Sequence, residues 1–180
     1  MGKSSDERQP FESALAPLLR PAYQLAFGML QSREEAEDAV QEAAMRAWMK
    51  RANLREGSEL RPWFLAIVAN QCRTVVRGRW WTVLKRPELP SPAAGTEPAL
   101  DEVVQGIVLR NAIRRLPHRQ RLVIVLHFYL DLTFDEVAAV TRESTAAVKS
   151  RIYRAARELA PLVSAREGFG LDGRASLSNS

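Results

Sequence analysis

The chain has 180 residues, 46% of them hydrophobic, which suits one ordinary domain or two small ones. The single cysteine, Cys72, excludes an internal disulfide and a thiolate zinc site, and the two histidines lack further ligands at useful spacing. The N-terminus has no apolar core of signal-peptide length and no stretch approaches a membrane span. We therefore expect a cytoplasmic protein without membrane insertion, metal or cofactor.

The net charge of +5 is modest, but the charges are unevenly distributed along the chain. The segment from Glu34 to Glu42 contains five acidic residues and no basic one. The segment from Arg61 to Arg86 contains six basic residues and no acidic one. Separate acidic and basic surfaces indicate two kinds of partner, one cationic and one polyanionic.

An opening helix is expected from about Phe11, after a disordered tail at residues 1–10. Its apolar residues recur at helical spacing. Pro17 and Pro21 should bend or interrupt it, because proline cannot complete the backbone hydrogen-bond ladder. This helix begins a first domain that we expect to span residues 11–81.

A second helix should begin after Ser32, because Ser32 and Glu35 have the S-x-x-E spacing of a capping box. The pattern predicts that this helix ends near Arg51, with its small apolar residues facing inward. After a turn, Pro62 suits the first position of a third helix, since its missing N–H is tolerated there. The third helix is apolar in its first half and basic in its second.

Residues 82–99 contain four prolines and no apolar periodicity, which indicates an extended, flexible linker. Such a stretch is too long for a loop inside one compact domain. We therefore expect two domains joined by this linker, the second at residues 100–163, followed by a disordered tail at residues 164–180. No strand pattern is present, so the predicted fold class is all-α, with two small helical domains.

A helix-turn-helix pattern lies at the end of the second domain. Thr133 and Glu136 form another capping box, which predicts a short helix from Phe134. After a break, Ser144 or Thr145 can cap the next helix. A short helix, a tight turn and a long basic helix are the arrangement that places side chains in a DNA major groove.

The last predicted helix is apolar on one side and basic on the other. Its apolar positions recur at steps of four, three and four: Val148, Ile152, Ala155 and Leu159. The opposite side carries Lys149, Ser150, Tyr153, Arg154 and Arg157. A basic amphipathic helix can also be an ordinary solvated helix, but such a helix would normally interleave glutamate with its basic residues. The stretch from Val148 to Arg157 has four basic residues and no acidic one, which favours DNA contact.

Two parts of the chain resemble bacterial sigma factors of the sigma-70 family, in particular the small, two-domain, extracytoplasmic-function (ECF) type. The segment AEDAVQEAAMRAW (Ala36–Trp48) is similar to the most recognisable helix of the family, and RPWFLAIVANQCRTVVR (Arg61–Arg77) matches the helix after it. The segment LPHRQRLVIVLHFYLDLTFDEVA, followed by AVKSRIYRAARELAPL, is similar to the C-terminal domain of the family. Both parts in this order and at this separation make the resemblance specific.

This resemblance implies a sigma factor, which is not an enzyme: it binds core RNA polymerase and directs transcription initiation at a restricted set of promoters. The helix at Ala36–Trp48 would dock on a coiled coil of the polymerase β′ subunit. Its matching contact positions are Asp38, Gln41 and Glu42, and an acidic stripe would attract a basic coiled coil. The polymerase β subunit, promoter DNA and an anti-sigma factor are the other implied partners.

The resemblance also assigns DNA contacts to both domains. In the first domain, the positions that would engage the −10 promoter element are Asn70, Arg73, Arg77, Arg79 and Trp80. Arginine neutralises phosphate, and an aromatic ring can stack on an exposed base. In the second domain, the positions that would engage the −35 element are Lys149, Ser150, Tyr153 and Arg154, with Arg142 and Arg157 as phosphate contacts. A further basic group could serve either the DNA backbone or polymerase: Arg114, Arg115, Arg119 and Arg121.

One departure from the family pattern concerns the turn before the last helix, where glycine is usual and this chain has Arg142. The turn must accept a costlier backbone conformation or shift by a residue. The alternative function is a stand-alone helix-turn-helix regulator that does not engage polymerase, but such a protein has no use for the acidic segment at Glu34–Glu42. An enzyme has little support, because the sequence has no glycine-rich phosphate loop, metal constellation or nucleophile with a base.

Overall fold

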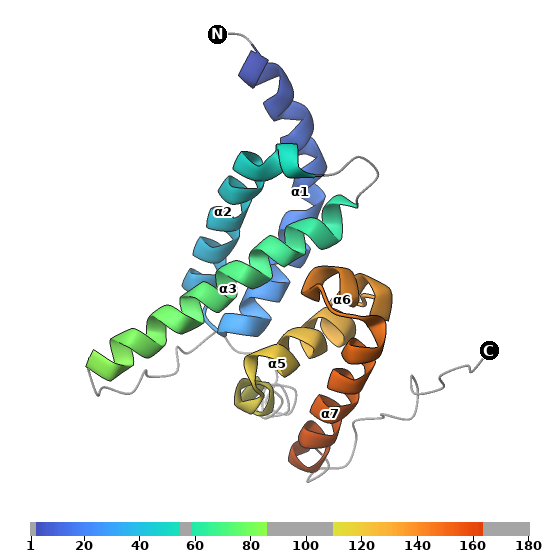
Figure 1. The fold of residues 1–180 in the computed structure, drawn as a ribbon. Helices are drawn as coiled ribbons and strands as arrows, with labels where there is room; N and C mark the ends of the chain where they lie inside the picture. The colour runs from blue at the N-terminus through green and yellow to red at the C-terminus, as the bar shows by residue number, and fades with distance from the viewer. Residues whose placement is uncertain (1–2, 55–58, 86–109, 164–180) are drawn as a thin grey trace, which may run out of the picture.

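The computed structural model describes residues 3–54, 59–85 and 110–163, where the secondary structure is helical without strands (Figure 1). The predicted all-α fold class is therefore confirmed for this part of the chain. The helices form two blocks, one from each half of the sequence. Most of the expected linker and the expected tail at residues 164–180 lie outside the described residues.

The first block consists of α1 (Lys3–Leu30), α2 (Arg33–Lys50), the short η1 (Arg51–Asn53) and α3 (Leu60–Lys85), with the three long helices packed together (Figure 1). Small side chains at the helix contacts allow close approach, and larger ones fill the centre. Fully buried members of this core include Ala26, Ala36, Ala43, Phe64 and Leu65. These residues come from all three helices, so the block has one apolar core.

Helix α1 corrects two expectations about the start of the chain. It begins at Lys3, so most of the tail expected at residues 1–10 is helical, and it continues through Pro10, Pro17 and Pro21 without interruption. Each proline removes a backbone hydrogen bond, but the apolar side of α1 is buried against its neighbours. Tertiary packing of that side outweighs the local penalty.

Helix α2 begins where the sequence predicts, and α3 is longer than expected. The Glu35 N–H donates to the Ser32 side chain at 3.4 Å, which makes Ser32 the N-cap. Helix α3 begins at Leu60, ahead of the expected start at Pro62, and extends to Lys85, beyond the expected domain end at residue 81. No proline or glycine interrupts the sequence from residue 79 to residue 86, which explains why the helix continues.

The second block consists of a helical segment at residues 110–115, α5 (His118–Ile124), η2 (Val125–Tyr129), α6 (Phe134–Thr141) and α7 (Thr145–Val163). Helix α5 leads directly into η2. The structure contains a continuous helical path there, but its last five residues form a π-helix. The predicted helix-turn-helix corresponds to α6 and α7.

The local signals of the helix-turn-helix are confirmed. The Glu136 N–H donates to Thr133 Oγ1 at 3.3 Å, and the Thr133 N–H donates to Glu136 Oε2 at 2.7 Å, which completes the capping box. Ser144 is the cap of α7, because its Oγ accepts from the Ala147 N–H at 3.2 Å. Arg142 adopts the left-handed conformation, with φ 58° and ψ 41°. The turn therefore adopts the costlier left-handed backbone conformation at Arg142 and does not shift by a residue.

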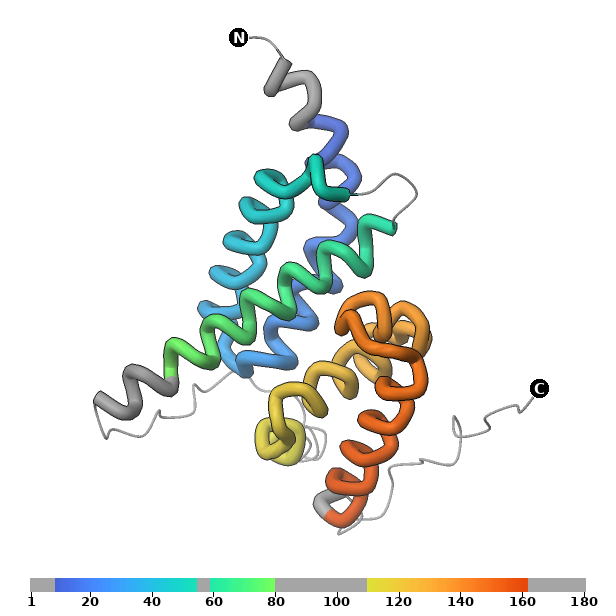
Figure 2. Tube along the Cα trace, viewed as in Figure 1, coloured from blue at the N-terminus to red at the C-terminus, as the bar shows by residue number. Residues whose placement is uncertain are grey.

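The two blocks pack directly against each other, which the sequence did not predict (Figure 2). Helix α6 contacts α3, and η2 contacts α1. Gly28 allows the second contact, since a Cβ there would lie 2.9 Å from Cγ1 of Val125. One apolar cluster extends through both blocks, and joins residues such as Leu25 and Met29 to Leu126 and Leu132.

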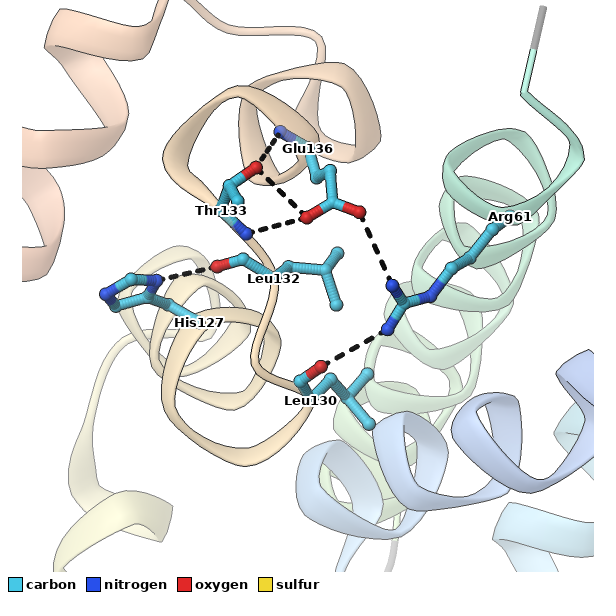
Figure 3. Close-up of polar contacts among 6 residues, drawn as sticks. All are labelled: Arg61, His127, Leu130, Leu132, Thr133 and Glu136. Carbon is cyan, nitrogen blue, oxygen red and sulfur yellow. Dashed lines mark hydrogen bonds and ion pairs between the residues drawn. The ribbon is translucent and has the colours of Figure 1, made fainter.

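Two arginines add polar contacts between the blocks, and we call these contacts the clasp. Arg61, on α3, donates to the carbonyl oxygen of Leu130 at 3.2 Å and lies 3.4 Å from Glu136 Oε1 (Figure 3). In the opposite direction, Arg121, on α5, donates to the carbonyl oxygen of Met29 at 2.9 Å. Each block therefore contributes one arginine to a backbone carbonyl of the other.

The strained turn yields a prediction about stability. Replacing Arg142 with glycine should raise the free energy of unfolding by about 1 kcal/mol, because the left-handed backbone is costly for residues with a Cβ. Urea unfolding followed by circular dichroism measures the change. The control Ala146→Gly, in the first turn of α7, should instead lower the free energy of unfolding by about 0.5–1 kcal/mol. Destabilisation by both substitutions would contradict the explanation of the turn.

The environment of Cys72 yields a second prediction. Burial raises the pKa of its thiol from 9.0 to about 12, against a smaller lowering by a backbone hydrogen bond. The folded protein should therefore resist alkylation at pH 8, and the urea-unfolded protein should react. The same shift should lower the free energy of unfolding as the pH rises above about 9, since only the unfolded chain readily loses this proton. Alkylation is measured by mass spectrometry, and rapid alkylation of the folded protein at pH 8 would contradict the expected resistance of Cys72.

Candidate nucleic-acid interface

Helix α7 has the two sides that the sequence predicted. Val148, Ile152 and Ala155 are buried, and Leu159 is partly buried against the smaller apolar cluster of the second block. The predicted contact positions on this helix are all exposed: Lys149, Ser150, Tyr153, Arg154 and Arg157. Arg142, in the preceding turn, is also exposed. The structure therefore brings the six positions expected to contact the −35 element to one accessible part of the second block.

Contacts between α6 and α7 hold the start of α7 in place. The Thr145 hydroxyl donates to Asp135 Oδ1 at 2.7 Å. Arg151 and Glu143 form an ion pair at 2.9 Å, with only 23% of each side chain exposed. Arg151 is thus turned toward the protein, and the outward basic surface of α7 consists of the other three basic residues. A rigid support of this kind helps a helix present its side chains in a fixed geometry.

Two shallow depressions lie next to each other on the outward side of α7, and both are lined by Ser150 and Arg154. One also includes Tyr153 and Arg157. The other extends to the start of α5, where it includes Arg119. The sequence alone did not assign Arg119 to either the DNA backbone or polymerase. The structure puts it beside the predicted recognition helix.

The electrostatic environment at the start of α5 is strongly basic. Burial, and after it the charges of Arg121, Arg73 and Arg119, lower the pKa of His118. His118 is therefore neutral at pH 7, and the positive charge in this region comes from the arginines. Arg121 does not face outward, because its guanidinium donates to carbonyl oxygens of both blocks, including those of Ile113 and Met29.

The second half of α3 presents some of the residues expected at the −10 element. Asn70, Arg73 and Arg77 are exposed, and Arg73 Nη2 donates to Asn70 Oδ1 at 2.8 Å. Three polar side chains on successive turns of one helix can follow a nucleic-acid strand. The side chain of Trp80 lies outside the described residues.

Arg79 differs from the other residues expected at the −10 element, because it has partners on other helices of the first block. Arg79 forms an ion pair with Glu35, and its Nε donates to Glu35 Oε1 at 2.8 Å. The Arg79 guanidinium also donates to the carbonyl oxygen of Leu30 at 3.3 Å. Burial, and after it the charge of Arg114, lower the pKa of Arg79. In this structure Arg79 therefore connects α3 to the junction of α1 and α2, although 43% of its side chain remains exposed.

Helix α2, which carries the residues expected to contact polymerase, lies away from the second block (Figure 1). Asp38 and Gln41 are exposed. Glu42 is half-buried, and its Oε1 accepts from Arg46 Nε at 2.8 Å. An ion pair at the surface is weak, so Glu42 can exchange Arg46 for a basic partner. The three predicted polymerase contacts are thus available in the folded chain.

The described part of the chain offers no support for a metal centre or a membrane-spanning segment. Within it, no group of three or more histidine, cysteine, aspartate or glutamate side chains is arranged to hold a metal ion. None of its helices combines the length and apolar character needed to cross a membrane.

Two family profiles match the two blocks in chain order. The profile of sigma-70 region 2 matches residues 15–82, and the profile of sigma-70 region 4 matches residues 107–159. RNA polymerase sigma factor SigV of Bacillus subtilis is 29% identical over 134 residues, which cover 74% of this chain and 78% of SigV. ECF RNA polymerase sigma factor SigG of Mycobacterium tuberculosis is 30% identical over 182 residues, covering 86% of this chain and 49% of SigG. This chain thus spans most of SigV and about half of SigG.

Two solved protein complexes contain a chain with a similar arrangement of helices. The sigma factor RpoE of Bartonella quintana, in complex with the anti-sigma factor NepR, matches with a TM-score of 0.74 and 25% identity over 87% of this chain and 98% of RpoE. CnrH, in complex with the cytosolic domain of CnrY, matches with a TM-score of 0.63 and 23% identity over 91% of each chain. The second match supports the fold alone.

Proposed function

Because the chain belongs to the extracytoplasmic-function branch of the sigma-70 family, we propose that it binds core RNA polymerase and directs transcription initiation at a restricted set of promoters. The observation that carries this proposal is the presence of two exposed surfaces of opposite charge on one chain. The acidic surface is on α2 and the basic surface is on α7. A stand-alone regulator would need only the basic surface. In this proposal the protein gives promoter specificity to polymerase and does not itself catalyse a reaction.

In this proposal, α2 docks on the coiled coil of the polymerase β′ subunit. Asp38, Gln41 and Glu42 supply the polar contacts, and their acidity attracts a basic partner at long range. The structure supports this role through the exposure of Asp38 and Gln41 and the weak pairing of Glu42. The β subunit of polymerase is a further proposed partner within core polymerase.

The proposed DNA contacts use both blocks. Asn70, Arg73 and Arg77 are the positions on α3 that can engage the −10 element without a change in the protein. Arg79 would first have to leave Glu35, so we assign it a weaker role at DNA than its neighbours. Trp80 remains a proposal from the family pattern, as a ring that stacks on an unpaired base.

The basic side of α7 would enter the major groove of the −35 element. Side chains in the first half of a recognition helix reach base edges, which suits Lys149, Ser150, Tyr153 and Arg154. Arg142 and Arg157 lie at the two ends of this surface and suit phosphate contacts. Arg119 extends the basic surface and is a further candidate for a phosphate contact.

We also propose an anti-sigma factor as a partner and the cytoplasm as the place of action. The similar RpoE of Bartonella quintana is bound to the anti-sigma factor NepR. A protein that works on core polymerase and promoter DNA must act in the compartment that holds both.

Charge reversal on α2 tests the polymerase contact. Asp38→Arg combined with Glu42→Arg should abolish binding to core polymerase, because attraction becomes repulsion worth several kcal/mol at a desolvated contact. A pull-down with core polymerase measures binding, and circular dichroism checks that the helical content is unchanged. The control variant, Glu12→Arg with Glu59→Arg, makes the same change in net charge at exposed positions outside α2 and should retain binding. Equal binding by both variants would exclude the docking assignment.

A second test distinguishes base-specific contacts from contacts to the DNA phosphates. If Arg154 contacts a guanine, Arg154→Ala should weaken the free energy of DNA binding by about 1–3 kcal/mol and relax base selectivity at one position of the −35 element. Arg157→Ala should instead weaken binding to all promoters by a similar factor. It should also reduce the slope of log binding constant against log salt concentration by about one unit. Promoters mutated base by base, together with a salt titration, measure both effects. Equal and sequence-independent losses would show that the two roles are misassigned.

A further inference from the structure

We propose that Phe134 is a positioning residue for DNA recognition, because its ring holds the ammonium group of Lys149 in place on the outward side of α7. The contact would set one base preference of the protein before DNA arrives. This inference rests on the function proposed above, in which Lys149 contacts the −35 element. It is carried by a stack of side chains to which η2, α6 and α7 each contribute one member.

The stack is built around the ring of Phe134, the first residue of α6. The imidazole of His127, from η2, stacks on this ring, with centroids 4.6 Å apart and an angle of 23° between the planes. Lys149 Nζ, from α7, lies over the same ring, 5.3 Å from its centroid. A cation within about 6 Å of the centroid is attracted by the negative face of an aromatic ring. Phe134 therefore links the support from η2 to the charge on the recognition helix.

His127 gives the Phe134 ring a fixed support. Its Nδ1 lies 2.7 Å from the carbonyl oxygen of Leu132, and because a carbonyl oxygen only accepts, Nδ1 carries the proton and donates (Figure 3). The ring of Phe128 packs edge-on with the imidazole, with centroids 4.8 Å apart. An imidazole held by a hydrogen bond and a second ring has few orientations available, so the ring stacked on it is restricted as well.

The backbones on the two sides of the contact are fixed relative to each other. Thr133 caps α6 immediately before Phe134. The hydroxyl of Thr145 donates to Asp135 Oδ1 at 2.7 Å. This bond joins the residue after Phe134 to the residue about one helical turn before Lys149. The separation of the two backbones is therefore nearly constant, and the remaining freedom lies in the lysine side chain.

A lysine benefits from such a contact because its own side chain does little to place its charge. The ammonium group is a compact charge on a flexible chain of four carbons. Ordering a side chain of this kind is part of the cost of binding, and a ring that orders it beforehand reduces that cost. On the outward side of α7, within the described residues, Lys149 is the basic residue whose charge lies over an aromatic ring.

Phe134 also has a purely structural use, since its ring is partly buried against the main apolar cluster. That use needs only an apolar side chain of similar size, whereas the contact with Lys149 needs an aromatic face. Leucine keeps the first property and loses the second, and tyrosine keeps both. A comparison of Phe134→Leu with Phe134→Tyr therefore separates packing from positioning.

The contact itself is tested in the free, full-length chain by nuclear magnetic resonance. Protons above an aromatic ring are shifted upfield by the ring current, so the ε-methylene protons of Lys149 should be shifted upfield in the unsubstituted chain. The shift should disappear in Phe134→Leu and remain in Phe134→Tyr. Unshifted Lys149 protons in the unsubstituted chain would overturn the proposal, whatever the result with DNA.

The effect on recognition is tested with the chain assembled on core polymerase and with promoters mutated base by base in the −35 element. Phe134→Leu should weaken binding to the preferred promoter about two- to fivefold, the effect of losing one exposed cation–π contact. It should also reduce base selectivity at the same position as Lys149→Ala does, whereas Phe134→Tyr should bind as the unsubstituted chain does. Equal losses at all base positions would show that leucine only disturbs packing, and would overturn the positioning role.

A double substitution shows whether Phe134 acts through Lys149. Once Lys149→Ala has removed the ammonium group, adding Phe134→Leu should cause no further loss of binding, because residues that act through one contact do not contribute independently. Multiplication of the two separate losses would overturn the proposal. The matched control is Tyr129→Leu, which removes an exposed aromatic ring of η2 outside the stack and should change neither the proton shift nor the selectivity.

Circular dichroism establishes that each variant is folded. If leucine at position 134 prevents folding, a fluorinated phenylalanine there keeps the shape of the ring and weakens its negative face, so it should reduce selectivity at the same base position. Full selectivity with the fluorinated ring would overturn the proposal. The absence of promoter-selective binding by the unsubstituted chain and by every variant would overturn the proposed function and, with it, the role of Phe134 at DNA, even if the upfield shift of Lys149 is present.

Discussion

The carboxylate of Glu136 takes part in two interactions on which the arrangement of the second block depends. Its Oε2 accepts from the backbone N–H and the hydroxyl of Thr133, which fixes the start of α6. Its Oε1 faces Arg61 of the other block. Because the two oxygens have separate partners, the same side chain that begins the helix-turn-helix also orients it toward α3. The local fold of the second block and its position on the first are therefore linked through one residue.

The arginines of this protein divide into two groups that composition does not distinguish. Arg61, Arg79, Arg121 and Arg151 all have partners within the protein, either carboxylates or backbone carbonyls. The outward-facing group includes Arg77, Arg119, Arg154 and Arg157. Guanidinium groups suit both tasks, since their five donors can satisfy several acceptors at once. A count of basic residues in the sequence therefore overstates the surface available to DNA.

Local patterns in the sequence predicted the caps of α2 and α6 and the buried side of α7. The caps at Ser32 and Thr133 and the apolar stripe of α7 depend on residues within a few turns of each other, so spacing alone reveals them. The packing of the blocks could not be predicted in this way, because the residues that make it are far apart in the chain, as Arg61 and Glu136 are. The internal role of Arg79 was missed for the same reason, since its partner Glu35 is on another helix. The continuity of α1 through its prolines was missed because tertiary burial outweighs the local preference.

The π-helical segment η2 lets the second block hold one residue more than an α-helix of the same rotation would. Its wide turn is closed by the bond from the Leu130 N–H to the Val125 carbonyl, at 3.1 Å. A π-helical turn is equivalent to an α-helix with one inserted residue, which the wide turn absorbs. The chain before and after η2 therefore keeps nearly the relative orientation that an uninterrupted α-helix would give. A one-residue deletion within η2 should leave the orientation of α6 nearly unchanged, whereas a further insertion that the turn could not absorb would rotate the following side chains by about 100°.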